Sequence, residues 1–90
     1  MKTYRLDVSD IATKEAFHLA IGELLSLPEH YGKNLDALFD CLSDLTEHTQ
    51  LMLNHSNALE ENLGDYGTRI RRMLTAAAQE NPHFVIIFDS

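Results

Sequence analysis

Three aspartates recur every four residues in the middle of the chain, within residues 34–45. Asp36, Asp40 and Asp44 have no basic residue between them, and Phe39 stands next to Asp40. Carboxylates accept paired hydrogen bonds from guanidinium groups, and an aromatic ring beside them can stack on the same cations. This ladder of carboxylates is therefore suited to hold a cluster of Arg and Lys side chains on another macromolecule.

Leucine spacing predicts the helix that presents these aspartates. At 100° per residue, an arc of about 80° holds four leucines and the aspartates fall on the opposite side. The four are Leu35, Leu38, Leu42 and Leu45, so we expect a helix from about Leu35 to Leu45. Most such stripes are merely solvated helix faces. However, like charges at positions i and i+4 repel by roughly 0.2–0.5 kcal/mol per pair, and Asp44 also opposes the helix dipole.

The segment before this helix, "PEHYGKN" at residues 28–34, consists of turn-forming residues. Gly32 is free to adopt a positive φ, and Asn34 is suited to cap the helix. His30 is expected beside the acidic helix, where protonation of its imidazole would make binding depend on pH. A solvated loop histidine without function explains His30 equally well.

Strand-like patterns occur at both ends of the chain and once between them. Tyr4, Leu6 and Val8 alternate with polar residues, and residues 49–55 indicate a second short strand. Residues 83–88, "HFVIIF", form a nearly continuous apolar run. Such a run is expected for a strand that is buried on both faces of a parallel sheet.

Helical patterns fill the intervals between these strands. The first helix is expected to have Ser9 or Asp10 as its cap and to end before Pro28. The other expected features are a short helix over residues 56–62, a break at 64–67 and a last helix that ends at the Asn81–Pro82 pair. Strands separated by helices favour right-handed crossovers and parallel pairing. The sequence therefore predicts an α/β fold, a three-stranded parallel sheet packed with about four helices, in a single domain over residues 1–90.

Charge and composition restrict the possible partners. The 90 residues include 14 acidic and 7 basic side chains, which gives a formal net charge of −7, and direct binding of nucleic acid is therefore disfavoured. Cys41 is the single cysteine, so no internal disulfide can form, and no apolar segment suits a signal peptide or a membrane span. We expect a cytoplasmic protein that does not bind membranes. We also expect a monomer, although no sequence pattern fixes the oligomeric state.

Catalytic and metal-binding chemistry find little support in the sequence. The five histidines lack the spacing of known metal motifs, and Cys41 has acidic neighbours that disfavour a nucleophilic thiolate. Asp36 and Asp40 could act as a glycosidase acid–base pair, but a 90-residue domain has little room for a cleft. We therefore expect no enzyme, no metal site and no cofactor.

Residues 25–45, "LSLPEHYGKNLDALFDCLSDL", resemble the barstar family of intracellular inhibitors of barnase, a secreted bacterial ribonuclease. The matching pattern is Leu-Pro-Glu, Tyr-Gly, Asn-Leu-Asp-Ala-Leu, an aromatic residue and Asp-Cys-Leu, and it covers residues 27–42. Chain length, element order and the terminal apolar strand match over the whole sequence.

The resemblance implies one-to-one inhibition of a basic, guanyl-preferring or related barnase-like ribonuclease. An acidic helix and the preceding loop would enter the active site of the enzyme, with carboxylates in place of RNA phosphates. Asp40 would occupy the position of the scissile phosphate, and Asp36 would contact neighbouring cations. The resemblance implies further contacts for His30, Gly32 and Asn34 in the loop, for Phe39, Ser43, Asp44 and Leu45 at the rim, and for Glu80 on the last helix.

Several positions depart from the family pattern. His30 and Phe39 replace other aromatic residues, Ser43-Asp44-Leu45 replaces Thr-Gly-Trp, and Ala76 stands where the family has a glutamate. A second function therefore stays open, that of an acidic adaptor for another basic protein, or of an immunity protein for a different basic toxin.

Overall fold

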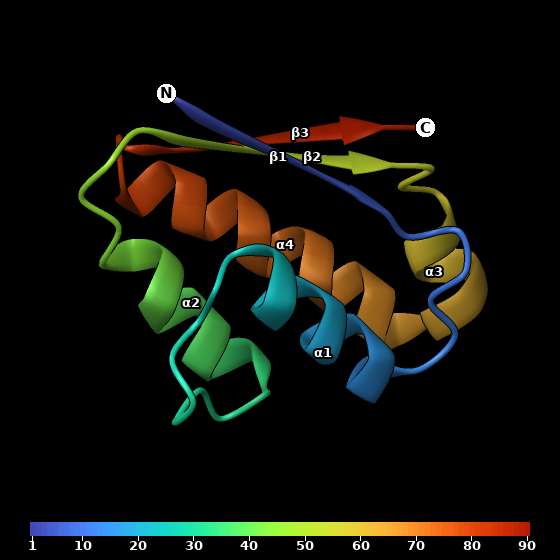
Figure 1. Cartoon of the computed structure of the whole chain (residues 1–90). Coiled ribbons are helices and arrows are strands. Elements are labelled where there is room, and N and C mark those ends of the chain that lie inside the picture. The colour runs from blue at the N-terminus through green and yellow to red at the C-terminus, as the bar shows by residue number, and fades with distance from the viewer.

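Three strands and four helices alternate along the chain in the predicted order. The computed structural model describes all residues, 1–90 (Figure 1). The elements are β1 (Lys2–Asp7), α1 (Lys14–Leu24), α2 (Leu35–Ser43), β2 (Thr49–Asn54), α3 (Ala58–Leu63), α4 (Asp65–Glu80) and β3 (Phe84–Asp89). The strands pair in parallel in the order β1-β2-β3, with β2 in the centre. The predicted α/β fold, a three-stranded parallel sheet with four helices, is confirmed.

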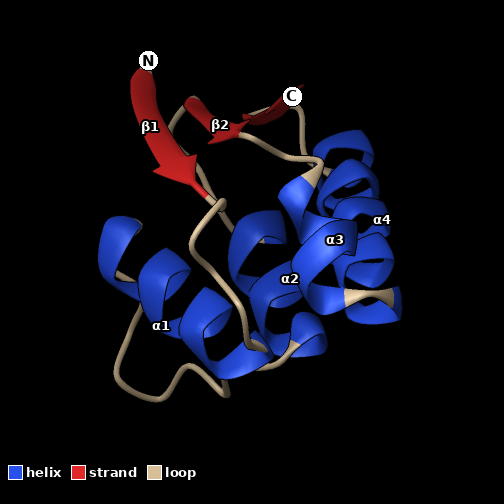
Figure 2. Ribbon diagram, turned by 90° about the vertical axis from the view of Figure 1, so that its right-hand side faces the viewer, coloured by secondary structure: helices blue, strands red, loops and turns tan.

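All four helices lie on one side of the sheet (Figures 1 and 2). On that side, Leu51 and Leu53 of β2 are fully buried. Val85 of β3, which pairs with Gln50 of β2, points to the opposite side and is 37 % exposed. The prediction that the last strand is buried on both faces is therefore wrong, because no helix covers the second face of the sheet. A continuous apolar run does not reveal how many of its faces are covered.

The predicted cap of the first helix is wrong. Thr13, and not Ser9 or Asp10, caps α1, since its hydroxyl accepts a hydrogen bond from the Ala16 N–H at 3.1 Å. The Ser9 N–H instead donates to Asp7 within a turn after β1. Only Thr13 stands directly before the first helical residue, where a side chain can reach the free N–H groups of the first turn.

The predicted break at residues 64–67 is shorter than expected. Gly64 has φ +58° and separates α3 from α4, whereas Tyr66 and Gly67 already belong to α4. Gly67 is buried, and a Cβ atom on it would lie 2.0 Å from the carbonyl oxygen of Leu59. This glycine is therefore needed because α3 and α4 approach closely, and not because of a turn.

The core confirms the predicted orientation of α2. Leu38 and Leu42 are fully buried and belong to one core cluster with residues of α1, β2 and α4, among them Phe17, Leu53 and Leu74. The face of α2 opposite these leucines consequently points to solvent. Nowhere does the chain form a helix with the length and apolar composition that crossing a bilayer would require.

Candidate protein-binding surface

Helix α2 presents its three aspartates to solvent without neutralising them. Asp36, Asp40 and Asp44 are all exposed, and their carboxylates form neither a hydrogen bond nor an ion pair. The three ion pairs of the chain lie elsewhere, and they are Lys2–Glu47, Arg71–Glu60 and His55–Asp7. The three carboxylates of this acidic stripe, Asp36–Asp40–Asp44, thus lie on one helix face with no cation of the chain to neutralise them, and they are free to bind a partner.

The charge pattern of α2 is not the one that best stabilises a helix. Asp36 lies in the first turn, where a negative charge is favourable, but Asp44 is the C-cap and the last turn contains no basic residue. A carboxylate at that end opposes the macrodipole, and the like charges repel one another. The stripe therefore costs stability, which favours a functional explanation.

The N-terminal end of α2 is fixed by the loop that precedes it. The Asn34 side chain accepts a hydrogen bond from the Ala37 N–H at 2.8 Å and donates to the Gly32 carbonyl at 3.3 Å, which confirms the predicted cap. The positive φ predicted for Gly32 is instead found at Lys33, where φ is +54°. A Cβ on Gly32 would lie only 3.3 Å from that of Ala37. Gly32 thus allows the loop to pack closely on the helix.

The C-terminal end of α2 is fixed by Asn81, which is 5 % exposed. Its amide nitrogen donates to the carbonyls of Leu42 at 2.9 Å and Leu45 at 3.0 Å, and it lies 3.4 Å from that of Ser43. Its oxygen accepts from the His83 N–H at 2.9 Å. The sequence identified Asn81 only as a helix end, because the carbonyls to which it donates lie more than 35 residues away.

A buried histidine holds the loop against the helices. His18 of α1 is 2 % exposed, and its Nδ1 forms a hydrogen bond with the Tyr31 hydroxyl while its Nε2 forms one of 2.6 Å with the Tyr66 hydroxyl. Burial lowers the pKa of His18, so the ring is neutral. The burial of His18 was not predicted. Its position three residues before Ile21, on the apolar side of the helix, was the signal that could have revealed its burial.

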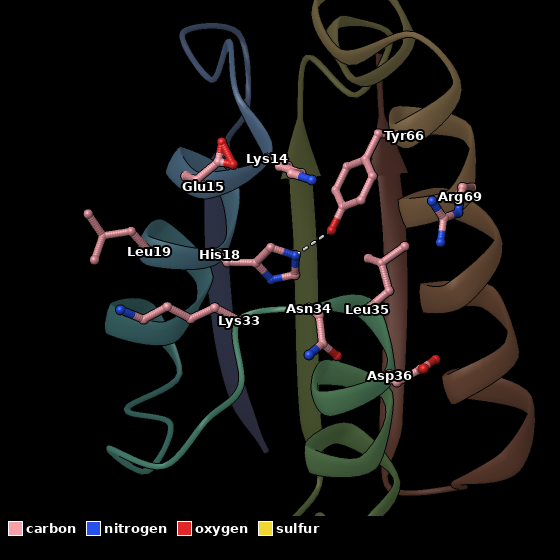
Figure 3. Close-up of a pocket in the computed structure, with 10 residues that line it drawn as sticks. All are labelled: Lys14, Glu15, His18, Leu19, Lys33, Asn34, Leu35, Asp36, Tyr66 and Arg69. Atoms are coloured by element: carbon pink, nitrogen blue, oxygen red, sulfur yellow. Dashed lines mark hydrogen bonds between the residues drawn. The ribbon is translucent and has the colours of Figure 1, made fainter.

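A groove of about 480 Å³ lies between residues 25–32 and α2, and we call it the loop–α2 groove. Five of the predicted contact residues line it, and they are His30, Gly32, Asp40, Asp44 and Leu45. Asn34 and Asp36 instead line a second groove, of about 680 Å³, between α1, residues 33–36 and α4 (Figure 3). We call this one the α1–α4 groove. Asp36 and Asp40 therefore border different hollows of one surface.

Three predicted contact residues lie outside both grooves. Phe39 and Ser43 are half-buried, Phe39 packs against the core, and the Ser43 hydroxyl is shielded from solvent without a hydrogen-bond partner. Glu80 is exposed at the end of α4, next to Asn81. A role for these three residues in binding stays a prediction.

Cys41 is half-buried and lines the loop–α2 groove. Burial raises the pKa of its thiol, and the charges of Asp40 and Asp44 raise it further. The group is thus a protonated thiol near neutral pH and a poor nucleophile. The chain also contains no group of three His, Cys, Asp or Glu side chains placed to hold a metal ion.

Comparison with known proteins identifies the family. The family model described as Barstar (barnase inhibitor) matches residues 1–89. A protein of Bacillus subtilis (strain 168) that carries the name "Putative ribonuclease inhibitor YrdF" is 30 % identical over 91 residues, which cover 99 % of this chain and 100 % of that protein. The chain belongs to the barstar family.

Proposed function

We propose that this protein is a cytoplasmic, non-catalytic inhibitor that binds a barnase-like ribonuclease one-to-one and blocks its active site. The α2 helix and residues 28–34 enter the cleft, and the carboxylates of Asp40 and Asp36 take the places of RNA phosphates. One observation supports this proposal above all. The three carboxylates of the acidic stripe are exposed together on one face of α2, and none of them is neutralised by a cation of the chain.

The anchors of α2 explain how such a stripe binds tightly. Asn34 and Asn81 fix the two ends of the helix, and His18 fixes the loop beside it through Tyr31. Binding then orders few additional groups, so the loss of conformational entropy offsets less of the favourable binding free energy. The net charge of −7 also attracts a basic partner over a distance.

Asp40 is the residue on which inhibition should depend most. It lines the loop–α2 groove at the centre of the stripe, so a cation of the enzyme that binds there becomes buried. Truncating one member of a charge pair buried in an interface costs roughly 2–5 kcal/mol, a range for which barnase and barstar are themselves a reference case. Asp40→Ala should therefore raise the dissociation constant by about 30- to 4,000-fold.

The test is a titration of a purified barnase-like ribonuclease with this protein, with RNA cleavage as the readout. We expect activity to fall linearly and to end at one inhibitor per enzyme, and Asp40→Ala to lose this behaviour. Asp10→Ala is the matched control, because Asp10 is exposed in the loop after β1 and its removal changes the net charge equally. Equal dissociation constants for the wild type and Asp40→Ala would refute the assignment.

A basic partner other than a barnase-like ribonuclease is the second candidate. His30 and Leu45 depart from the family pattern, and both line the loop–α2 groove beside Asp40. The residues that depart from the family pattern thus lie where they would determine which partner the surface binds. Recovery of bound proteins from lysate, followed by an assay of their ribonuclease activity after release, separates the two candidates.

A further inference from the structure

The α1–α4 groove collects basic side chains beside the acidic stripe. Lys14, Lys33 and Arg69 line it, which is three of the seven basic residues in a chain of net charge −7. None of the three forms an ion pair, whereas Lys2 and Arg71 do. The groove also contains the carboxylates of Glu15 and Asp36, but neither lies within ion-pair distance of a cation.

Two of these cations meet at the ring of Tyr66. The Lys14 ammonium lies 6.0 Å and the Arg69 guanidinium carbon 5.6 Å from the ring centroid. Figure 3 shows Lys14 reaching the ring from α1 and Arg69 flanking it from α4. An anionic group that enters the groove beside the ring is therefore attracted by both side chains.

The hydrogen bonds around His18 direct a third donor into the groove. Tyr31 is 7 % exposed, and the only polar partner of its hydroxyl is His18 Nδ1. We assign Tyr31 as the donor, because the opposite tautomer of His18 would leave the buried hydroxyl proton of Tyr31 without an acceptor. Neutral His18 then carries its proton on Nε2 and donates it to the Tyr66 oxygen at 2.6 Å. The Tyr66 hydroxyl proton has no acceptor within the chain. It is thus free to donate to a group bound in the groove.

The position of the groove identifies the source of that group. Asn34 and Asp36 line the groove and also belong to the surface that is expected to contact a partner. A macromolecule that places a cation on Asp36 therefore covers the groove as well. If it presented further cations there, it would be repelled by Lys14 and Arg69, because like charges brought together across an interface are unfavourable.

We propose that Lys14, Arg69 and the Tyr66 hydroxyl bind an acidic side chain of the same partner whose basic cleft receives α2. The proposal rests on the proposed function and adds to it the charge pattern of the partner, a basic cleft with a carboxylate at its border. The groove then helps the inhibitor to select its partner enzyme. It attracts enzymes with that pattern and rejects proteins that are uniformly basic.

The test compares Arg69→Gln and the double variant Lys14→Gln/Arg69→Gln with Arg72→Gln. Arg72 is the matched control, because it is exposed on the same helix, forms no ion pair and lines neither of the two grooves. Removal of any cation makes the inhibitor more acidic, so Arg72→Gln should leave its affinity for a basic ribonuclease unchanged or slightly higher. The groove variants should do the opposite. We expect a loss of up to about fivefold for the single variant, typical of an exposed ion pair, and a larger loss for the double variant.

The inhibition constant of a purified barnase-like ribonuclease at low salt is the measurement, with Asp40→Ala in the same series. If Asp40→Ala abolishes inhibition while the groove variants match Arg72→Gln, this proposal is refuted and the proposed function stands. If Asp40→Ala has no effect, both are refuted. A titration of the free protein with inorganic phosphate, followed by amide chemical shifts, tests for a small anion as the ligand. Submillimolar phosphate binding, together with unchanged inhibition by the groove variants, would also overturn the proposal.

Discussion

The buried side chain of Asn81 should make a large contribution to stability through its hydrogen bonds. Its amide has two N–H donors, which supply the bonds of 2.9 and 3.0 Å to Leu42 and Leu45, and its oxygen forms a third bond to His83. Each bond contributes about 1 kcal/mol net. Asn81→Ala should therefore lower the free energy of unfolding by about 3 kcal/mol. The loss should be larger if no water replaces the donor at the buried carbonyls.

A loss of this size is easily measured in a small domain. A chain of this length is stabilised by roughly 5–13 kcal/mol in total, and the urea midpoint should fall by about 1–3 M. Asn57→Ala is the matched control, because Asn57 is exposed and its side chain makes no capping hydrogen bond. Asn81→Asp should be worse than Asn81→Ala, since it directs a carboxylate at carbonyl oxygens in a buried site. If Asn81→Ala unfolds at the same urea concentration as Asn57→Ala, the anchoring role of Asn81 is wrong.

Two further predictions concern the scaffold behind the surface. Because burial lowers the pKa of His18 from its ordinary value of 6.5, the unfolded chain takes up the proton first, so the free energy of unfolding should fall as the pH decreases through about 6.5. In His18→Gln, urea unfolding should lose that part of the pH dependence, and an unchanged pH profile would show that another group titrates. Gly67→Ala should unfold the chain or destabilise it severely, because the new Cβ would lie 2.0 Å from the Leu59 carbonyl oxygen. In contrast, Gly22→Ala should stabilise α1 by about 0.5–1 kcal/mol, since its Cβ would meet only Tyr31 at 3.6 Å. Thermal melts in which both variants shifted in the same direction would contradict the structure.

The sequence predicts those parts of the site that depend on a single helix. The spacing of Leu38 and Leu42 is enough to orient α2, and the opposite face must then carry Asp36 and Asp40 into solvent. The cap at Asn34 is equally local, since donor and acceptor are three residues apart. Periodicity and capping operate within a few turns of the chain, so both can be inferred without knowledge of the fold.

The anchors and grooves depend on contacts between distant segments. The hydrogen bond from Asn81 to Leu42 joins residues 39 positions apart, and that between His18 and Tyr66 joins residues 48 apart. The residues that neighbour Asn81 and His18 in the sequence do not indicate such distant partners. Likewise, the open face of β3 depends on where the helices pack, and an apolar run such as "FVIIF" does not report it.

The anchors and the stripe are two parts of one requirement. Carboxylates that bind a partner's cation tightly cannot already be paired with cations of their own chain. The ion pairs that would otherwise stabilise α2 are therefore excluded. The helix is held instead by neutral groups, Asn34, Asn81 and the pair of His18 with Tyr31, whose hydrogen bonds leave the charges free. Loosening one of these anchors should then leave the long-range attraction, and hence the association rate, nearly unchanged. It should instead increase the dissociation rate, because the bound carboxylates would gain freedom to leave the geometry in which they meet their partners.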